Sequence, residues 1–301
     1  MTLDQLRIFL AVADEQHVTR AAHALNLTQS AVSASIAALE ARHDVKLFHR
    51  VGRRIELTEA GQVLIPQARA ILAKVDAASL ALSELGGMVA GRLRIAASQT
   101  VASYWLPARL VHLHEVHPRL AIDLTVTNTA HAAEMLAEGQ VDLAIVEGAV
   151  DDPQLTGQVV DRDRLVLVVG RGHPWAGCGQ VDASELASSK WIMREEGSGT
   201  RAEFQHWLEA RGTALDDLSV ILEFPSNEAV LAAVADCQAA SVLSERAVRP
   251  GVRSGLLVAV DARLPERLFT VLRHRERYLT RAAGALMELL EAASGPPNGD
   301  G

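Results

Sequence analysis

Residues 19–61, TRAAHALNLTQSAVSASIAALEARHDVKLFHRVGRRIELTEAG, decide the fold of the N-terminal third of this 301-residue chain. Their apolar positions predict a short Ala-rich helix over residues 19–25, after which Asn26 and Leu27 break the pattern. Thr28 then suits the N-cap of a longer helix, because its side-chain oxygen can accept from an amide of the first turn. Apolar side chains recur in that helix at i, i+4 and i+7 from Val32, so the stretch predicts a helix, a tight turn and a second helix.

The polar face of the longer helix carries short hydrogen-bonding side chains. They lack bulk and lie opposite the apolar positions, which suits contacts with base edges when a helix lies in the major groove of DNA. We therefore predict that this is a DNA-recognition helix. Its predicted DNA-binding residues are Thr28, Gln29, Ser30 and Ser33.

A small β-hairpin is predicted directly after this helix. Residues 46–58, KLFHRVGRRIELT, alternate polar and apolar side chains around a turn at Gly52, with Arg50, Arg53 and Arg54 at the tip. A basic turn that stood alone would be interpreted as a solvated loop. Because this one follows a predicted recognition helix, we expect its arginines to contact phosphates or the minor groove as a wing.

A long helix is predicted from Thr58 towards Gly86, and it carries a heptad pattern. The alternative is an amphipathic helix packed on its own domain, but a 3.5-residue repeat over three heptads favours pairing with a second copy. Pro66 removes one backbone hydrogen bond, so we expect a kink there. The predicted dimerisation residues are Leu64, Ala68, Ile71, Val75, Ala78, Leu82 and Leu85.

The remainder of the chain alternates short apolar runs with helical patterns. The order predicts parallel βαβ units in two α/β lobes, of which the first is completed by RLFTVLRHR and the helix from Thr280 to Ala293. We expect lobe I over about 91–163 and 268–295, lobe II over about 164–267, and a disordered tail at 296–301.

Residues 19–61 resemble the helix-turn-helix signature of LysR-type transcriptional regulators, except that His43-Asp44 stands where the family usually has Leu-Gly. The resemblance extends over nearly the whole chain. It implies a winged helix-turn-helix (1–60), a linker helix (61–90) and an effector domain shaped like a periplasmic binding protein (91–295). It also implies dimers that join into a tetramer on two half-sites of promoter DNA; RNA polymerase is a further candidate partner. The matching residues are Ala21, Ala22, Leu25, Thr28, Gln29, Ala31, Val32, Ser33, Ile36, Leu39, Glu40, Leu47, Phe48, Arg50, Arg54, Leu57, Thr58, Ala60 and Gly61.

Polar residues follow several strands of the two lobes at the junction with the next helix. Such junctions offer free amides and the positive end of a helix dipole, which favour an anion. Each alone is more simply a helix cap, but junctions that face each other across a cleft favour a small polar, anionic effector. Glu147 and Glu195 near the cleft would repel an anion or accept from a hydroxyl or amino group of the ligand. The predicted effector-binding residues are Ser98, Gln99, Thr100, Asn128, Ser198, Gly199, Thr200 and Asn227.

Composition and charge set limits on the class of protein. The chain is 49% hydrophobic and 22% charged, which is ordinary for a globular protein. Its net charge is −8, yet residues 1–91 hold nine basic and nine acidic side chains, so this part repels phosphate less than the rest. No apolar run reaches the roughly 20 residues that span a bilayer, and we expect a cytoplasmic protein without a signal peptide or membrane contact.

Three rival interpretations are weaker. An enzyme is disfavoured because GSGTR lacks the lysine of a phosphate-binding loop and no HExxH or GxSxG occurs, so we expect no catalytic residues, metal site or cofactor. A transport solute-binding protein would not explain residues 1–90. A redox sensor would need Cys178 and Cys237, whose spacing does not indicate a switch.

Overall fold

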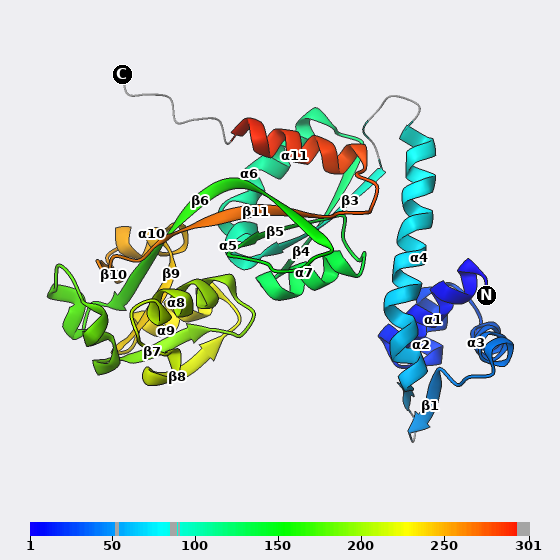
Figure 1. Cartoon of the computed structure of the whole chain (residues 1–301), viewed down its shortest axis with the longest axis horizontal. Helices are drawn as coiled ribbons and strands as arrows, with labels where there is room; N and C mark the ends of the chain where they lie inside the picture. The colour runs from blue at the N-terminus through cyan, green and yellow to red at the C-terminus, as the bar shows by residue number, and fades with distance from the viewer. Residues whose placement is uncertain (52–53, 85–88, 90, 294–301) are drawn as a thin grey trace. The chain divides into compact units, whose positions relative to one another are not determined.

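The computed structural model describes residues 1–51, 54–84, 89 and 91–293. The chain divides into two compact units, residues 1–86 with 138–140 and residues 87–137 with 141–301. We call them the N-terminal unit and the effector unit (Figure 1). The predicted Arg53, Leu85 and the tail at 296–301 lie outside the described residues.

Three short helices and a hairpin form the N-terminal unit before its long helix. They are α1 (Leu3–Glu15), α2 (Val18–Ala24), α3 (Gln29–His43), β1 (Phe48–Val51) and β2 (Arg54–Leu57). Thr28 is the N-cap of α3, and its hydroxyl accepts from the amide of Ala31 at 3.2 Å, which confirms the predicted helix start. Strands β1 and β2 pair antiparallel, with Phe48 opposite Leu57, so the predicted hairpin is confirmed.

Helix α4 (Glu59–Glu84) is one helix that continues through Pro66. Ala68 is fully buried in the core of its own unit, with Leu6 and Phe9 of α1. Leu64 and Ile71 are half-buried against the same core. The first half of the predicted heptad seam therefore packs within the unit, as the alternative interpretation expected.

Further along α4, Val75 is half-buried and Ala78 is exposed. The structure describes Leu82 only as part of the helix. Pairing of the linker helices stays a prediction.

A continuous mixed sheet runs through the effector unit. Its order is β4-β3-β5-β11-β6-β9-β7-β8, and β10 pairs with β6. Its strands are β3 (Gly91–Ser98), β4 (Leu120–Thr127), β5 (Leu143–Glu147), β6 (Leu155–Gly170), β7 (Lys190–Arg194), β8 (Ser219–Phe224), β9 (Ala239–Ser244), β10 (Leu257–Val260) and β11 (Glu266–His274).

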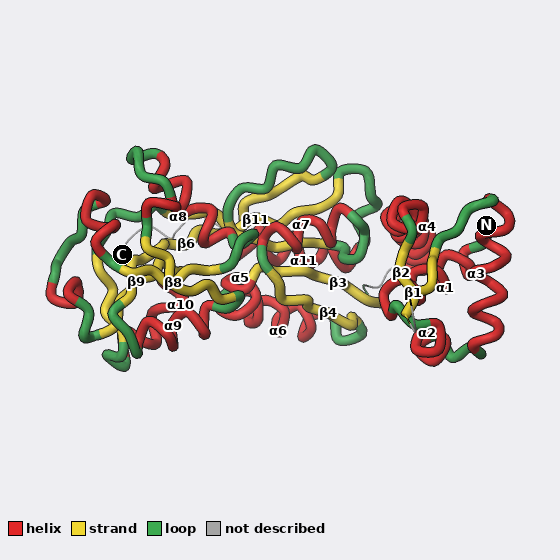
Figure 2. Tube along the Cα trace, turned by 90° about the horizontal axis from the view of Figure 1, so that it is seen from below, coloured by secondary structure: helices red, strands yellow, loops and turns green. Residues whose placement is uncertain are grey.

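The helices lie on both sides of these strands (Figure 2). Lobe I holds β3–β5 with α5 (Gln99–Tyr104), α6 (Leu106–Val116), α7 (Thr129–Ala137) and α11 (Arg281–Ala293). Lobe II holds β7–β10 with α8 (Gly199–Glu209), α9 (Asn227–Ala235) and α10 (Glu245–Arg253). Short 3₁₀ helices span Pro174–Gly177, Ala183–Ser188 and Leu215–Asp217.

Strands β6 and β11 join the two lobes, and we call them the hinge strands. β6 pairs with β11 through its first half and with β9 and β10 through its second half. The sequence predicted only residues 164–170 of this strand, because residues 155–163 mix polar and apolar side chains without a clear strand period. A change in lobe arrangement therefore has to pass through these two strands.

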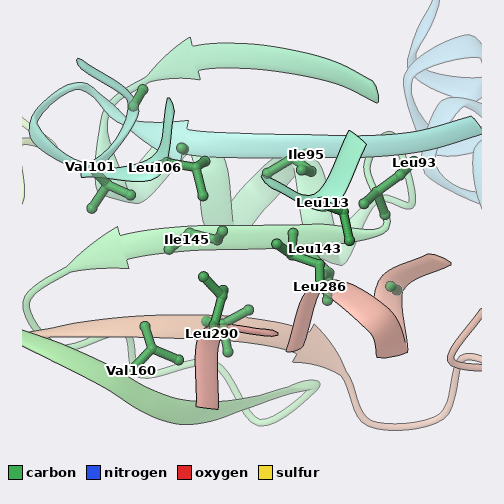
Figure 3. Close-up of a cluster of buried hydrophobic side chains, with 14 of the residues drawn as sticks. Leu93, Ile95, Val101, Leu106, Leu113, Leu143, Ile145, Val160, Leu286 and Leu290 are labelled. Atoms are coloured by element: carbon green, nitrogen blue, oxygen red, sulfur yellow. The ribbon is translucent and has the colours of Figure 1, made fainter. Parts of the chain in front are cut away.

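Each lobe has its own hydrophobic core. In lobe I, Leu93, Ile95 and Ile145 of the sheet meet Leu286 and Leu290 of α11 (Figure 3). Lobe II is built around rings instead, and the centroids of Trp191 and Phe204 lie 5.2 Å apart. Burial of each such side chain contributes about 1.5–3 kcal/mol, so each lobe can remain rigid while the hinge strands bend.

Glu40 connects helix α3 to the hairpin. Its carboxylate is buried and accepts from the amides of Leu47 at 2.9 Å and Phe48 at 3.4 Å, and from Nζ of Lys46 at 2.6 Å. Burial alone would raise the pKa of Glu40, but the hydrogen bonds from Lys46 and the two amides outweigh it and hold this pKa below its usual value. The contact fixes where the hairpin starts relative to α3.

This arrangement predicts a pH dependence of local stability. Since the folded pKa of Glu40 lies below its unfolded value of about 4.3, its contribution is present above that pH and is lost as pH falls through the folded pKa. Glu40→Gln should destabilise the region by about 1–3 kcal/mol at neutral pH and reduce its loss of protection in acid. Hydrogen exchange of peptides covering residues 45–51 measures this. Glu59→Gln, an exposed change in the same unit, is the control, and identical protection in both variants would contradict the assignment.

Candidate functional site

The exposed face of α3 carries the polar residues expected to contact DNA. Thr28, Gln29, Ser30 and Ser33 are all exposed. The Thr28 hydroxyl caps the helix and lies 3.1 Å from the Ser30 hydroxyl. Within the described residues, the side chains of Gln29 and Ser33 make no hydrogen bond, so their polar groups are available to a ligand.

The hairpin next to α3 places the basic residues in two strands. Arg50 lies in β1 opposite Ile55, and Arg54 lies in β2 opposite Val51. The backbone of this hairpin is held to α3 through Glu40. A protruding helix followed by a basic hairpin is the arrangement that a winged helix-turn-helix needs.

The predicted effector residues come together between the lobes. Gln99 and Thr100 begin α5 of lobe I, and Asn227 begins α9 of lobe II. The amide of Asn227 donates to Oε1 of Gln99 at 2.6 Å, and its Nδ2 donates to Oγ1 of Thr100 at 3.2 Å. All three are buried. We call these residues, with Ser98, Asn128, Ser198, Gly199 and Thr200, the interlobe site.

Asn128 contacts the loop that leads into α8. Its Nδ2 donates to the carbonyl of Glu196 at 3.3 Å, and the amide of Ala130 donates to the carbonyl of Gly197 at 3.1 Å. Gly199 begins α8 in close contact with lobe I, because an added Cβ would lie 2.2 Å from the carbonyl oxygen of Glu147. Only glycine allows this approach of the α8 N-terminus.

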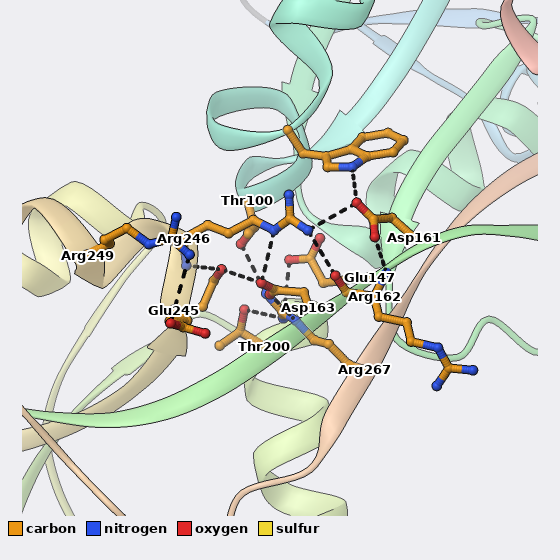
Figure 4. A network of polar contacts seen from close by, with 12 residues as sticks. Thr100, Glu147, Asp161, Arg162, Asp163, Thr200, Glu245, Arg246, Arg249 and Arg267 are labelled. Carbon is orange, nitrogen blue, oxygen red and sulfur yellow. Dashed lines mark hydrogen bonds and ion pairs between the residues drawn. The ribbon is translucent and has the colours of Figure 1, made fainter. Parts of the chain in front are cut away.

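A buried arginine lies at the centre of the interlobe site. Arg267 on β11 contacts Asp163 of β6 with Nε at 2.9 Å and Nη2 at 2.8 Å (Figure 4). Its Nη1 donates to Oγ1 of Thr200 at 2.7 Å, and its Nη2 to Oγ1 of Thr100 at 3.4 Å. One guanidinium therefore holds a hinge carboxylate and one threonine from each lobe.

A second buried arginine lies on the lobe II side. Arg194 ends β7 and is 2% exposed. It forms a two-point contact with Glu195, at 2.8 Å from Nε and 3.0 Å from Nη2, and its Nη1 donates to Oδ1 of Asn227 at 2.7 Å. Sequence reasoning missed Arg194 and Arg267. The available signal was an arginine beside an apolar run, after WIM in KWIMR and before LF in RLFTVL.

The acidic residues of the interlobe site are compensated within the chain. Glu147 is buried, accepts from the Ser98 hydroxyl and lies 3.7 Å from Nη1 of Arg267. Glu195 is paired with Arg194. The expected repulsion of an anion by these two carboxylates is therefore offset by neighbouring donors.

Glu228 on α9 bridges the lobes beside this cluster. It accepts from the Tyr104 hydroxyl at 2.7 Å and from the side-chain amide of Gln99. Burial alone would raise the pKa of Glu228, but the hydrogen bonds from Tyr104, its own backbone amide and Gln99 outweigh it and lower this pKa. Burial and the adjacent carboxylate raise the pKa of Tyr104 well above its usual value. Tyr104 therefore stays a neutral phenol, and its hydroxyl donates to the ionised Glu228 carboxylate.

One hydroxyl at the N-terminus of α8 is left without a hydrogen-bond partner in the described part of the chain. Ser198 is the N-cap of this helix and is 2% exposed, yet its side chain makes no capping bond. A buried polar group without a partner costs about 1–3 kcal/mol. The helix offers free amides at the same point, so this end of the interlobe site can bind a small hydrogen-bonding group.

Within the described residues, no group of three or more His, Cys, Asp or Glu side chains could hold a metal ion. None of the helices described is long and apolar enough to cross a membrane. Cys178 is exposed and Cys237 is partly exposed.

Sequence comparisons match both units to one family. A profile described as "Bacterial regulatory helix-turn-helix protein, lysR family" matches residues 3–62, and "LysR substrate binding domain" matches residues 86–295. The chain is 32% identical over 298 residues to the HTH-type transcriptional regulator YeiE of Escherichia coli (strain K12), covering 98% of this chain and 99% of that protein. It is 33% identical over 297 residues to the RuBisCO operon transcriptional regulator of Allochromatium vinosum, covering 97% of each.

Solved structures show the same fold. CbnR in complex with its target DNA superposes with a TM-score of 0.70 at 20% identity, covering 97% of this chain and 100% of that one. The regulatory domain of Synechocystis PCC6803 CcmR, in complex with 2-PG, gives a TM-score of 0.63 at 28% identity, covering 68% of this chain and 98% of that one. The fold class predicted from the sequence is confirmed.

Removal of the Arg267 guanidinium should lower the denaturant concentration at which the effector unit unfolds. Arg267→Met would leave the buried Glu147 without its cation and the buried Asp163 with only the longer ion pair to Arg246 at 3.5 Å among the described residues, which costs about 3–5 kcal/mol. Arg273→Met, on the same strand and only half-buried, should change stability by less than about 1 kcal/mol. All four tryptophans belong to the effector unit, so urea denaturation followed by tryptophan fluorescence measures its stability. Equal midpoints for the two variants would argue against a central role for Arg267.

Proposed function

This chain belongs to the LysR family of DNA-binding transcriptional regulators, and from that premise we propose that a small polar anion between its lobes controls how it binds promoter DNA. Proteins of this family are regulators rather than enzymes, as the sequence predicted. The observation that carries the proposal is the buried, unpartnered Ser198 hydroxyl at the N-terminus of α8.

Sequence-specific DNA recognition is assigned to α3 and the hairpin. The exposed Gln29 and Ser33 support base contacts, since both side chains have unused hydrogen-bonding groups. The basic Arg50, Arg53 and Arg54 support contacts with phosphates or the minor groove. Base contacts should determine which sequence is bound, and the arginines should determine how strongly DNA of any sequence is held.

These two roles predict different mutant behaviour. Gln29→Ala should cost about 1–3 kcal/mol at particular base pairs and relax the sequence preference there. Arg53→Ala should weaken binding to all sequences and flatten its salt dependence by loss of a phosphate contact. In vitro selection of bound DNA, followed by anisotropy titrations at several salt concentrations, separates the two outcomes.

The control for the first variant is Gln62→Ala, an exposed glutamine that belongs to α4 rather than to α3. If Gln29→Ala and Arg53→Ala both bind the selected sequences like the parent protein, the assigned DNA surface is wrong.

An anionic effector is supported by the electrostatics of the interlobe site. Glu195 is paired with Arg194 and Glu147 lies 3.7 Å from Arg267, which reduces their repulsion of an anion, and the first-turn amides and the dipole of α8 favour negative charge. The Ser198 hydroxyl gains its missing partner when a ligand binds. CcmR, whose regulatory domain matches this unit, was solved in complex with 2-PG, which supports a ligand-binding role for the matching domain.

Regulation requires that the ligand bind one lobe arrangement better than another. The bonds from Asn227 to Gln99 and Thr100, and from Gln99 and Tyr104 to Glu228, join the lobes directly. A ligand that inserts between these residues exchanges lobe-to-lobe bonds for lobe-to-ligand bonds. The resulting change in the hinge strands would then be transmitted to the spacing of the DNA-binding units.

An oligomer is the second part of the proposal. We infer that two copies pair along α4 beyond the part that packs in the N-terminal unit, from Val75 onwards. Dimers would join into a tetramer through their effector units, with two-fold symmetry that matches an interrupted palindrome in DNA. RNA polymerase remains a candidate partner at the promoter.

Ser198→Ala gives the clearest test of the effector site. Thr100→Val would also remove the acceptor used by Arg267 and Asn227, whereas the Ser198 hydroxyl makes no bond that would be lost. Ser198→Ala should therefore leave stability and effector-free DNA binding unchanged but weaken the effector by roughly 1–3 kcal/mol. A calorimetric screen of carboxylates, sulfur oxyanions and sugar phosphates identifies a ligand, whose affinity is then compared between variants.

The matched control is Ser241→Ala on β9. Its hydroxyl is likewise buried and unpartnered in the described structure, but Ser241 lies within a strand rather than at a helix N-terminus. It should bind the ligand like the parent protein. Equal affinity for the ligand in Ser198→Ala and Ser241→Ala would refute the placement at α8.

A further inference from the structure

A second polar cluster joins the two lobes at the hinge strands, and it contains none of the residues of the interlobe site. Its centre is Asp161 of β6, whose Oδ2 lies close to three donors. Nε1 of Trp105 donates at 2.5 Å, Nη2 of Arg246 donates at 3.0 Å, and Nη2 of Arg109 lies 3.8 Å away. Figure 4 shows Arg246 reaching from α10 to Asp161. Lobe I supplies two of these donors and lobe II supplies the third.

Asp161 adjoins an irregularity in the pairing of the hinge strands. It lies opposite Phe269 of β11. Val159 lies opposite Thr270, so Val160 is an extra residue on β6. A β-bulge of this kind bends its strand and increases the local twist. Beyond Asp161 the strand continues into its pairing with β9 of lobe II, so the bulge is a pivot at which β6 bends between the lobes.

The two donors from lobe I are fixed to that lobe. Trp105 is buried in the lobe I core, and the Arg109 guanidinium lies over its ring, with Cζ 3.9 Å from the ring centroid. Nη1 of Arg109 donates to the carbonyl of Trp105 at 2.8 Å. Its Nε, however, is buried without a hydrogen-bond partner among the described residues, and 3.8 Å is too long for a hydrogen bond to Asp161. Arg109 is thus a half-buried cation with an unsatisfied donor beside a carboxylate.

Arg246 holds the same carboxylate from lobe II. Its Nη2 also donates to the carbonyl of Arg162 at 3.0 Å, and its Nε lies 3.5 Å from Asp163. Burial lowers the pKa of the Arg109 guanidinium, the Asp161 charge raises this pKa, and the nearby charge of Arg246 lowers it further. The two arginines therefore repel each other and compete for Asp161. In the arrangement described, Arg246 is the one that forms the hydrogen bond.

We propose that Asp161 is a two-position switch at the pivot between the lobes. In the arrangement described it binds Arg246 of lobe II, and in a second arrangement, rotated about the bulge, it binds Arg109 of lobe I instead. The exchange gives Nε of Arg109 the acceptor that it lacks, while Arg246 keeps Asp163 as its acidic neighbour. Because each charge has a partner in both arrangements, the two lie close in free energy.

The switch is connected to the interlobe site through β6. Asp163, two residues beyond Asp161, binds Arg267, whose guanidinium holds Thr100 and Thr200. Rotation about the bulge therefore changes the interlobe site, and an effector that prefers one arrangement sets the position of the switch. Only this last step rests on the proposed effector, because the exchange between the two arginines requires no ligand.

Distances between spin labels on the two lobes of the effector-free full chain test the switch. One label is attached to the exposed Cys178 of lobe II. The other is attached at an exposed position of α6 in lobe I through the substitution Glu115→Cys, in a Cys237→Ala background. Dilution with unlabelled protein restricts the measurement to distances within one chain. Pulsed electron paramagnetic resonance then gives the population of each lobe arrangement.

Arg246→Gln should raise the population of the second arrangement about tenfold, because it removes a charge-assisted contact that favours the first. Arg246→Lys keeps the charge but not the forked donor geometry, so it should raise that population less. It also provides the test if the glutamine variant does not fold. Arg249→Gln is the matched control, since it removes the same charge from an exposed position of α10, and it should keep the distribution of the parent protein.

The double variant Arg109→Gln with Arg246→Gln separates a switch from a loosened hinge. The second arrangement needs Arg109, so the double variant should return to the distribution of the parent protein. The proposal is overturned if the second population persists in the double variant, or if Arg246→Gln and Arg246→Lys both keep the parent distribution. The ligand affinity of Ser198→Ala is measured separately, so failure of the switch and failure of the effector proposal are distinguishable.

Discussion

The contact between Arg267 and Asp163 is the interaction on which the effector unit depends. Both residues lie on hinge strands, both are buried, and the guanidinium also reaches Thr100 of lobe I and Thr200 of lobe II. A buried ion pair is a poor source of stability, because the loss of hydration cancels most of the attraction. A well-packed apolar pair at this position would hold the strands together at least as well. The pair instead fixes the orientation of the Arg267 guanidinium, so that its remaining N–H groups donate to one threonine hydroxyl from each lobe.

That geometry determines what the hinge can do. The lobes have separate cores of aliphatic and aromatic side chains, and the polar cluster around Arg267 lies where the two bodies meet. Polar contacts of this kind can exchange partners at small net cost, whereas packed cores cannot deform continuously. The interlobe hydrogen bonds of Asn227 and Glu228 are therefore the contacts most easily replaced when a ligand enters. Regulation then depends on a difference in free energy between two sets of hydrogen bonds.

Sequence patterns predicted those parts of the structure that are determined by residues close together in the chain. The α3 start at Thr28, the hairpin and the alternation of strands and helices each follow from spacing and capping within a few residues. Strand-to-helix junctions likewise indicated Gln99, Thr100 and Asn227, which the fold brings into contact. The heptad pattern of α4 could not show which partner its apolar side chains contact. A helix that pairs with a second copy and a helix that packs on its own unit have the same apolar spacing. Ala68 belongs to that core.

What the sequence could not indicate are contacts between residues far apart in the chain. Arg194 is the last residue of β7 and Arg267 the second residue of β11, so both look like solvated strand ends in the sequence until Asp163, Glu195 and Asn227 are brought beside them.

These partners also change how the interlobe site must recognise its ligand. Because each buried arginine is already neutralised by a carboxylate of the chain, neither can supply a full unit of charge to the effector. Selectivity for an anion has to come from the amides of α8, which keep a fixed direction, and from the Ser198 hydroxyl, which has no competing partner among the described residues. A site of this kind discriminates by the placement of acceptor oxygens rather than by net charge. Two anions of equal charge but different shape should therefore differ more in affinity than two similar shapes that differ in charge.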